Sequence, residues 1–267
     1  MHSSTAVRLT CCLALLVLTA CSTTSTSTDL ATVQQADLQT LRVGISPDYP
    51  PVIYKKDGRI CGIEADLAAY VAERLGARLE FVEMPFEELV PQLEARKIDV
   101  IMSGMSIADS RRDKVRFVSP YLHMGQMALV RASDAARLSA PGALEHGGLR
   151  VGCVRGTTGE LFARQNMSNS TCQAFGEPEQ AVAQLRSGQL DVYLDDAPFV
   201  LQTAKDDSTL AAVPWLLTDE YLAWAVPRGA DYDYLYDQLN LLAQRAKQRG
   251  DLQRIIRRYF IIEIRVK

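Results

Sequence analysis

Two phrases of similar pattern constrain the fold of this chain more than any other feature. They read RKIDVIMSG at residues 96–104 and SGQLDVYLDD at residues 187–196. In each, a short polar turn follows a predicted helix and is followed by an apolar run of the kind that forms a strand buried on both faces. We interpret them as equivalent positions in two units of similar build.

The first unit alternates strands with helices. An Asp57-Gly58 turn between residues 52–54 and 59–63 indicates a β-hairpin. The β-α-β-α-β order that follows implies an α/β fold with a doubly wound parallel sheet. The predicted strands are 41–45, 78–83 and 99–102, and the predicted helices are 64–75, ending at Gly76, and 86–96.

The second unit repeats this alternation after a crossing segment. Gln126–Arg131 is predicted to cross in an extended conformation, and the chain ends in helices from Asp233 with a break at Gly250. The other predicted strands are 149–154, 172–175, 189–194 and 222–226, and the other predicted helices are 158–167 and 179–187. Both units therefore belong to the same fold class.

Composition excludes several classes of function. The 267 residues are 48% hydrophobic and 23% charged, values ordinary for a folded globular protein. The net charge is -3, and the only concentrated basic block is Arg254–Arg258, so a nucleic-acid-binding surface is not indicated. No CxxC motif or histidine cluster predicts a metal site, and no cofactor is expected. Amino-acid, peptide and sugar ligands remain open.

The first residues indicate export. Arg8 precedes an apolar run at 9–17 that is too short to span a bilayer, and Leu18-Thr19-Ala20-Cys21 resembles the bacterial lipobox. That resemblance implies a signal peptide at 1–20 and a lipid-carrying Cys21, which begins a flexible Ser/Thr-rich tether over 21–37. An ordinary secretory signal with a chance cysteine is the alternative.

Three cysteines remain in the body of the chain, and an odd number cannot all pair internally. Cys153 and Cys172 lie in two predicted strands separated by one helix, so they are candidates for a disulfide between neighbouring parallel strands. The alternative is two buried thiols that act as small apolar groups, and Cys61 would be the free residue.

The stretch from Ile98 to Tyr121 contains the first candidate binding group. Small polar residues occupy 103–106, where the predicted strand ends, and Arg111 follows a candidate helix start at Asp109. Ligands of open α/β sheets bind at the carboxyl ends of strands, and arginine offers two parallel donors to a carboxylate. For a lone arginine a solvated surface position is the alternative.

The ordered motifs resemble the type II periplasmic substrate-binding proteins. The likeness is to the amino-acid-binding branch of ABC importers, bacterial extracellular solute-binding protein family 3, and it covers about 41–259. It rests on GIEADLAAYVAERLG at 62–76, the stretch Ile98–Tyr121, VRGTTGE at 154–160 and Asp195-Asp196-Ala197-Pro198. Each motif is weak alone, and four in this order behind a lipobox are specific.

The resemblance implies two lobes joined by two hinge strands, with the ligand between them. Lobe 1 would comprise 38–126 and 222–267, and lobe 2 would comprise 130–218. The hinges would lie near Gln126–Val130 and Thr218–Tyr221.

The resemblance also implies roles for seven residues. Arg111, the backbone N–H of Ser106 and Thr158 would bind the ligand α-carboxylate. The carbonyl of Gly104, the hydroxyl of Ser106 and the carboxylate of Asp196 would bind its ammonium group, with Asp195 as a rival. The remaining two residues, Tyr49 and Phe86, are aromatic and would enclose the ligand side chain.

Some residues depart from the family pattern. Val52 replaces the usual phenylalanine, and Ala108-Asp109 replaces Thr-Pro, so Asp109 is expected to cap the following helix. Ser46 stands where binders of dibasic amino acids carry an acid, which weakens an assignment to arginine or lysine. The side-chain specificity is therefore open.

The predicted function is a monomeric, lipid-anchored amino-acid receptor, in the periplasm or at the cell surface, that delivers its ligand to an ABC permease without catalysis. One alternative is an enzyme resembling cyclohexadienyl dehydratase, although Glu160 is expected to point away from the cleft. The other is a ligand-sensing receptor with a different partner.

Overall fold

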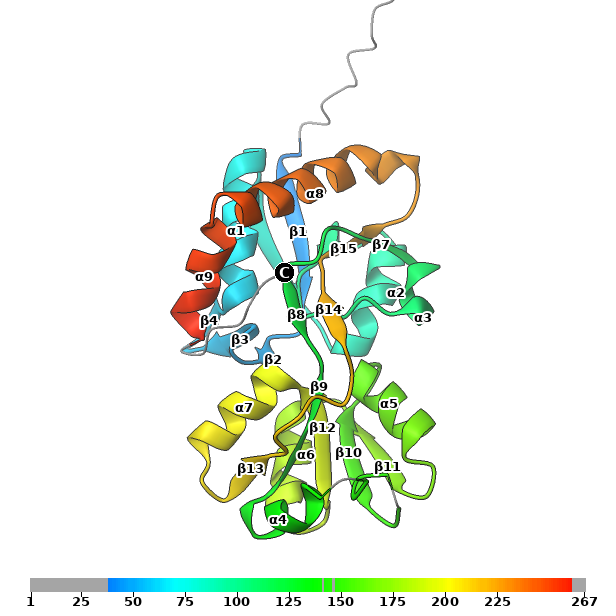
Figure 1. Ribbon diagram of the computed structural model, residues 1–267. Helices are drawn as coiled ribbons and strands as arrows, with labels where there is room; N and C mark the ends of the chain where they lie inside the picture. Colours follow the sequence, from blue (N-terminus) through cyan, green and yellow to red (C-terminus); the bar gives the residue numbers. More distant parts are fainter. Residues whose placement is uncertain (1–37, 141, 146, 261–267) are drawn as a thin grey trace, which may run out of the picture. The chain divides into compact units, whose positions relative to one another are not determined.

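The protein is described by a computed structural model over residues 38–140, 142–145 and 147–260. Within these residues, two five-stranded sheets each carry helices and two apolar clusters (Figure 1). The predicted signal peptide, Cys21, the tether and the last seven residues assigned to lobe 1 lie outside the described residues.

The first sheet has the strand order β5-β1-β6-β15-β7. β1 pairs in parallel with β5 and β6, and β15 pairs antiparallel with β6 and β7. The strands are β1 Thr40–Ile45, β5 Arg78–Glu83, β6 Val100–Ile101, β7 Val115–Phe117 and β15 Ala225–Pro227. The helices around it are α1 Ile63–Leu75, α2 Leu89–Glu94, α3 Asp109–Arg112, α8 Asp233–Gln248 and α9 Asp251–Tyr259.

Alternation along β1 explains why this sheet is covered on both faces. Leu41, Val43 and Ile45 are fully buried in the cluster that includes apolar residues of α1, α8 and α9. Gly44 points the other way, where a Cβ would come 2.2 Å from Ile98 and 3.3 Å from Leu89. Successive residues of a strand face opposite sides, so one strand contributes to both clusters.

The second sheet has the strand order β11-β10-β12-β9-β13. β10 pairs in parallel with β11 and β12, whereas β9 pairs antiparallel with β12 and β13. The strands are β9 Gln126–Arg131, β10 Arg150–Val154, β11 Thr171–Phe175, β12 Val192–Asp196 and β13 Leu210–Ala212. The helices are α4 Ala135–Leu138, α5 Thr158–Asn166, α6 Pro178–Arg186 and α7 Ala197–Asp206.

Gln126–Arg131 is extended, as predicted, but it is also a strand of the second sheet, which the sequence did not predict. As β9 it pairs antiparallel with β12 and β13. Met127 and Leu129 are buried in one apolar cluster, and Ala128 and Val130 are buried in the other. A run that is apolar on both faces is more stable as an interior strand than as a solvated connection.

Two other strands, paired antiparallel, run between the sheets (Figure 1). These are β8 Leu122–Met124 and β14 Glu220–Leu222. Just beyond β8 the two segments approach so closely that a Cβ on Gly125 would lie 2.0 Å from the backbone oxygen of Thr218. Gln126 N–H also donates to Thr218 Oγ1 at 2.8 Å. Glycine is therefore required where the two segments meet.

The two repeated phrases occupy equivalent positions, as predicted. Asp99 accepts hydrogen bonds from the backbone N–H and the guanidinium of Arg42, at 2.8 and 2.6 Å. Asp191 accepts the same pair from Arg150, at 2.9 and 2.6 Å. The Arg150 guanidinium lowers the pKa of Asp191 to about 2. The same ion pair therefore joins neighbouring parallel strands in both sheets.

Most local predictions were confirmed. Lys56 pairs with Arg59 across the hairpin, formed by β3 Ile53–Lys56 and β4 Arg59–Cys61 beside β2 Asp48–Tyr49, and Gly76 ends α1 in the left-handed region. The helix predicted at 86–96 is shorter and begins as the 3₁₀ turn Phe86–Glu88. The other 3₁₀ turns are Ala132–Asp134 and Ala230–Tyr232. Across the described ranges, no helix combines the length and apolar character needed to cross a bilayer.

Candidate functional site

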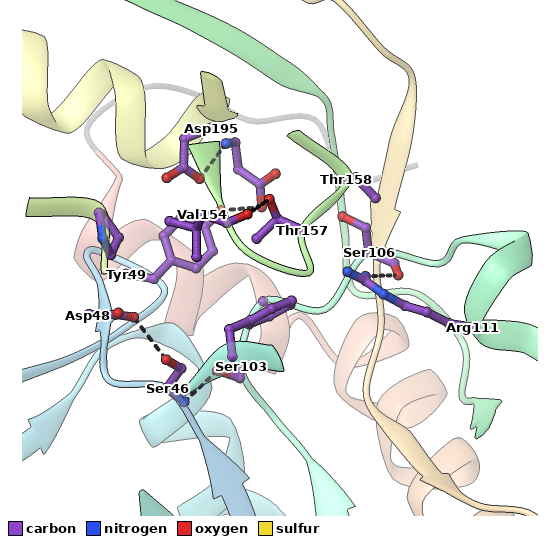
Figure 2. Close-up of a pocket in the computed structure, with 14 residues that line it drawn as sticks. Ser46, Asp48, Tyr49, Ser103, Ser106, Arg111, Val154, Thr157, Thr158 and Asp195 are labelled. Atoms are coloured by element: carbon purple, nitrogen blue, oxygen red, sulfur yellow. Dashed lines mark hydrogen bonds between the residues drawn. The ribbon is translucent and has the colours of Figure 1, made fainter. Parts of the chain in front are cut away.

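A cavity with about 460 Å³ of empty space, part of it open to solvent, lies where strands of the two sheets end (Figure 2). β1 and β6 lead into it from the first sheet, and β10 and β12 lead into it from the second. This is the position at which ligands bind to open α/β sheets. Its lining residues are Ser46, Asp48, Tyr49, Phe86, Ser103, Gly104, Ser106, Arg111, Val154, Thr157, Thr158, Pro178, Asp195 and Asp196.

Arg111 is buried at one end of this cavity. Its guanidinium donates to the backbone oxygen of Ser106 at 2.8 Å and to that of Gly156 at 2.9 Å, so it contacts segments that follow strands of both sheets. The guanidinium carbon also lies 5.4 Å from the centre of the Phe86 ring. Burial lowers the pKa of Arg111. The other N–H donors have no partner among the described residues and are available to an anion.

The expected cap at Asp109 was wrong. The N-cap position of α3 is Ala108, with no side-chain hydrogen bond, and Asp109 pairs with the exposed Arg112 at 3.1 Å. The helix is only one turn long, and the backbone conformation of Ala108 places Asp109 one position inside it. Arg111 is thus held by its own hydrogen bonds rather than by a capped helix.

Thr157 and Thr158 have different roles at the start of α5. Thr157 is the N-cap and accepts the N–H of Glu160 at 3.3 Å, while Glu160 accepts the N–H of Gly156 at 2.8 Å. This reciprocal arrangement resembles a capping box. Thr158 is the first helical residue, so its hydroxyl is not needed as a cap and lines the cavity.

A polar network joins Thr158 to the strands between the sheets. Thr158 donates to Glu220 at 2.8 Å and accepts from the amide of Gln126 at 3.0 Å. The other oxygen of Glu220 accepts from Thr218 at 2.6 Å. Gln126 also donates to Asp196. The network connects the cavity wall to β14.

Asp196 is the last residue of β12 and is buried in the cavity wall. It accepts a hydrogen bond from the hydroxyl of Tyr49 at 2.8 Å, a contact between β2 and β12. Burial raises its pKa well above the usual range, and the charges of Asp195 and Glu220 add to that effect. The strand predicted at 189–194 in fact runs to Asp196, which places both acids at the strand's carboxyl end.

Gly104 explains how Tyr49 reaches the cavity. Its φ is +64°, and a Cβ would lie 2.4 Å from the Tyr49 ring, so only glycine permits this approach. The Gly104 N–H donates to the carboxyl group of Glu64, a fully buried residue of α1. Burial raises the pKa of Glu64 to about 8.

Cys153 and Cys172 lie on the neighbouring parallel strands β10 and β11, as predicted. Their sulfur atoms are 3.2 Å apart, and both residues are free thiols in the structure. The hydrogen bond from Cys153 lowers the pKa of Cys172 to about 7. A disulfide between them therefore remains a prediction.

The structure brings all seven predicted ligand-binding residues to one cavity: Tyr49, Phe86, Gly104, Ser106, Arg111, Thr158 and Asp196. Sequence reasoning missed Asp48, Glu64, Gln126 and Glu220. Asp48 had a usable signal, because it adjoins Tyr49 in a proline-rich loop after a strand. The other three interact through the tertiary fold and carried no local signal.

Comparison with known proteins agrees with this geometry. Residues 41–262 match the family of bacterial extracellular solute-binding proteins, family 3. The chain belongs to this family. Among similar family proteins is a probable histidine-binding protein of Campylobacter jejuni, 32% identical over 68% of this chain and 69% of the relative. A putative ABC transporter arginine-binding protein of Escherichia coli is 28% identical over 83% of this chain and 91% of that relative.

Solved structures give the same fold. An ancestral amino acid-binding protein, described as a precursor of cyclohexadienyl dehydratase, superposes with a TM-score of 0.78 at 30% identity. The match covers 83% of this chain and 96% of that one. The two-lobed binding-protein fold is therefore established for the chain.

Proposed function

We propose that the protein binds a free α-amino acid in this cavity and releases it to an ABC permease. The observation that carries the proposal is the presence of Arg111 and Asp196 on the wall of one cavity. A buried guanidinium with free donors suits a carboxylate, and a buried carboxyl group suits an ammonium group. Relatives named for histidine and arginine binding support an amino acid as the ligand.

The ligand α-carboxylate is assigned to Arg111, the N–H of Ser106 and the hydroxyl of Thr158, which would turn from Glu220 to donate to the ligand. The start of α5 adds a favourable helix dipole at Thr158. The ammonium group is assigned to Asp196, with the Gly104 carbonyl and the Ser106 hydroxyl beside it.

Tyr49 and Phe86 are assigned to the ligand side chain. Both rings line the cavity, Tyr49 from β2 and Phe86 from the 3₁₀ turn before α2. Tyr49 is positioned by its close approach to Gly104 and by the Phe199 ring, whose centre is 6.3 Å away. Aromatic walls of this kind exclude water and orient a ligand.

Capture is proposed to occur by closure of lobe 1 (38–126 and 222–267) on lobe 2 (130–218). With β9 inside the second sheet, β8 and β14 are the better hinge candidates. Contacts between the lobes support closure: Tyr49 bonds Asp196, and Arg155 pairs with Glu87 at 3.0 Å. A ligand that bridges both lobes favours the closed form through its additional contacts there.

The protein is proposed to be a monomer anchored to a membrane by a lipid on Cys21. The Leu18-Thr19-Ala20-Cys21 sequence supports this anchor, and membership of an extracellular family supports a location outside the cytoplasm. The permease partner is inferred from the transporter role of the Escherichia coli relative.

The experiment is a thermal-shift titration of the purified protein with the standard amino acids. One or a few should raise the free energy of unfolding by about 2.7 kcal/mol at a hundredfold excess over the dissociation constant. Asp196→Asn should weaken that response because it removes the charge that binds the ammonium group. If every amino acid leaves the melting temperature unchanged, the proposal is wrong.

A dehydratase is the second candidate, because one structural neighbour is described as a precursor of cyclohexadienyl dehydratase. Burial raises the pKa of Asp195 to about 7, which is suitable for a general acid. Incubation with prephenate distinguishes the two functions. We expect no phenylpyruvate, and its catalytic formation would favour the enzyme.

A further inference from the structure

The cavity has an acidic end away from Arg111. Figure 2 shows Ser46 and Asp48 on one side of the cavity and Arg111 and Ser106 on the other. Two surface grooves adjoin the cavity, one at its acidic end and one at the end that contains Arg111. One shares Ser46 and Asp48 with the cavity, and the other shares Arg111, Thr157 and Thr158.

Two carboxyl groups define this acidic end, one from each lobe. Asp48 lies in β2, after the first strand of the first sheet, and Asp195 lies in β12 of the second sheet. Both line the cavity together with Tyr49. Burial raises the pKa of Asp195 to about 7, and the charge of Asp48 adds to this shift. A group placed between them would contact both lobes.

Both carboxyl groups accept hydrogen bonds from neutral donors. Asp48 accepts from the Ser46 hydroxyl at 3.2 Å. Asp195 accepts from the Asp196 N–H at 2.7 Å and from the Tyr193 hydroxyl. Within the described part of the chain, neither aspartate forms an ion pair with an arginine or lysine. A buried carboxylate without a cation is unfavourable.

The surroundings add negative charge. Burial raises the pKa of Asp48, and the charges of Glu177 and Glu87 contribute to this shift. The adjoining groove contains both of these glutamates, together with the ion pair of Lys55 and Glu83. Glu87 is paired with Arg155, so Glu177 and Asp48 are the acids of this group that lack a cation among the residues described. The local field attracts a positive ligand group.

We propose that the bound amino acid has a positively charged side chain, whose guanidinium or ammonium group lies between Asp48 and Asp195. This inference rests on the proposed amino-acid-binding function. With the α-carboxylate at Arg111 and the ammonium group at Asp196, the side chain passes Tyr49 and extends to the acidic end. Asp48 thus supplies the negative charge that Ser46 lacks, from two residues further along the chain.

A neutral side chain would leave both aspartates without a cation. An anionic side chain would add a fourth negative charge to the two aspartates and Glu177. A guanidinium group has five N–H donors, enough to reach both carboxylates, and an ammonium group has three. The arrangement therefore discriminates by charge more than by shape.

The decisive test compares L-arginine with L-citrulline in calorimetric titrations of the unaltered protein. Citrulline has nearly the same shape but carries a neutral ureido group in place of the guanidinium. We expect arginine to bind at least tenfold more tightly. Lysine compared with glutamine tests an ammonium group in the same way and should favour lysine if the shorter cation reaches the site.

Variants then locate the effect. Asp48→Asn and Asp195→Asn each keep an acceptor oxygen and remove a charge. Each should weaken arginine binding at least tenfold and change citrulline binding less than threefold. Asp57→Asn removes one negative charge from the exposed hairpin turn and should change neither ligand.

The outcomes separate this inference from the function on which it rests. If citrulline or glutamine binds as tightly as arginine and lysine, the cationic side chain is refuted and amino-acid binding stands. If no amino acid binds, both are refuted. If arginine is preferred but both Asn variants retain that preference, the charge lies elsewhere and the assignment to Asp48 and Asp195 is wrong.

Discussion

Replacing Arg111 with alanine tests the centre of the proposed site. The guanidinium is buried and makes two backbone hydrogen bonds, at 2.8 and 2.9 Å, to Ser106 and Gly156. The substitution removes the donors assigned to the ligand carboxylate. It also removes a buried charge, so the protein without ligand avoids a desolvation cost that partly offsets the two lost bonds.

The expected loss of affinity follows from the bonds to the carboxylate. Two hydrogen bonds to a charged group, each at the lower end of about 1.5–3 kcal/mol, give a loss of about 3 kcal/mol. That corresponds to roughly a 150-fold weaker dissociation constant. At a ligand concentration about a hundredfold above the original constant, stabilisation falls from about 2.7 to about 0.3 kcal/mol.

The assay is thermal unfolding with and without the preferred amino acid. For a domain of this size the ligand-induced shift should fall from roughly 5–11 °C to about 1 °C. Arg112→Ala is the matched control, because the neighbouring arginine is exposed and pairs with Asp109 at the surface. An Arg111→Ala protein that keeps the full shift refutes the carboxylate assignment. A protein that no longer folds shows that Arg111 is structural.

Three further predictions concern other parts of the chain. Glu64→Gln should reduce the pH dependence of stability. The folded pKa of Glu64, about 8, exceeds the ordinary 4.5, so this group alone should cost about 1.4 kcal/mol of stability per pH unit as the pH rises between these two values; urea unfolding of the variant should lack that share. Mass spectrometry of the unreduced protein should find Cys153 joined to Cys172, and two free thiols would contradict the disulfide. Cys21→Ser should move the protein from the membrane to the soluble fraction of a bacterial host, and unchanged fractionation would contradict the lipid anchor.

The predicted fold succeeded where local pattern and burial agree. The repeated Asp99 and Asp191 phrases identified two sheets of similar build, because each strand is apolar on both faces and each aspartate bonds an arginine at the start of the adjacent strand. Gln126–Arg131 is extended as predicted, but its place inside the second sheet was not predicted. Its residues are apolar on both faces as well, but its antiparallel pairing with β12 and β13 depends on segments far along the chain.

The residues of the candidate site also differ in whether the sequence predicted them. Arg111 and Thr158 were found because strand ends and helix starts are local features with known ligand preferences. Asp48 was passed over because the family pattern directed attention to Ser46. The importance of Asp48 depends on its placement opposite Asp195, which comes from the other sheet, and no local spacing encodes that proximity.

The distribution of charge explains why an amino acid fits this protein better than a simple anion or cation. Arg111, which follows β6 of the first sheet, contributes a buried guanidinium with free donors, and β12 of the second sheet ends in the half-buried Asp195 and the buried Asp196. Each charge is unfavourable in a low-dielectric cavity, and the direct bonds between the lobes neutralise neither. A ligand with a carboxylate at one end and positive charge along the rest satisfies both lobes at once. The binding energy is then largest in the closed form, since only closure brings both sets of charges onto the same molecule.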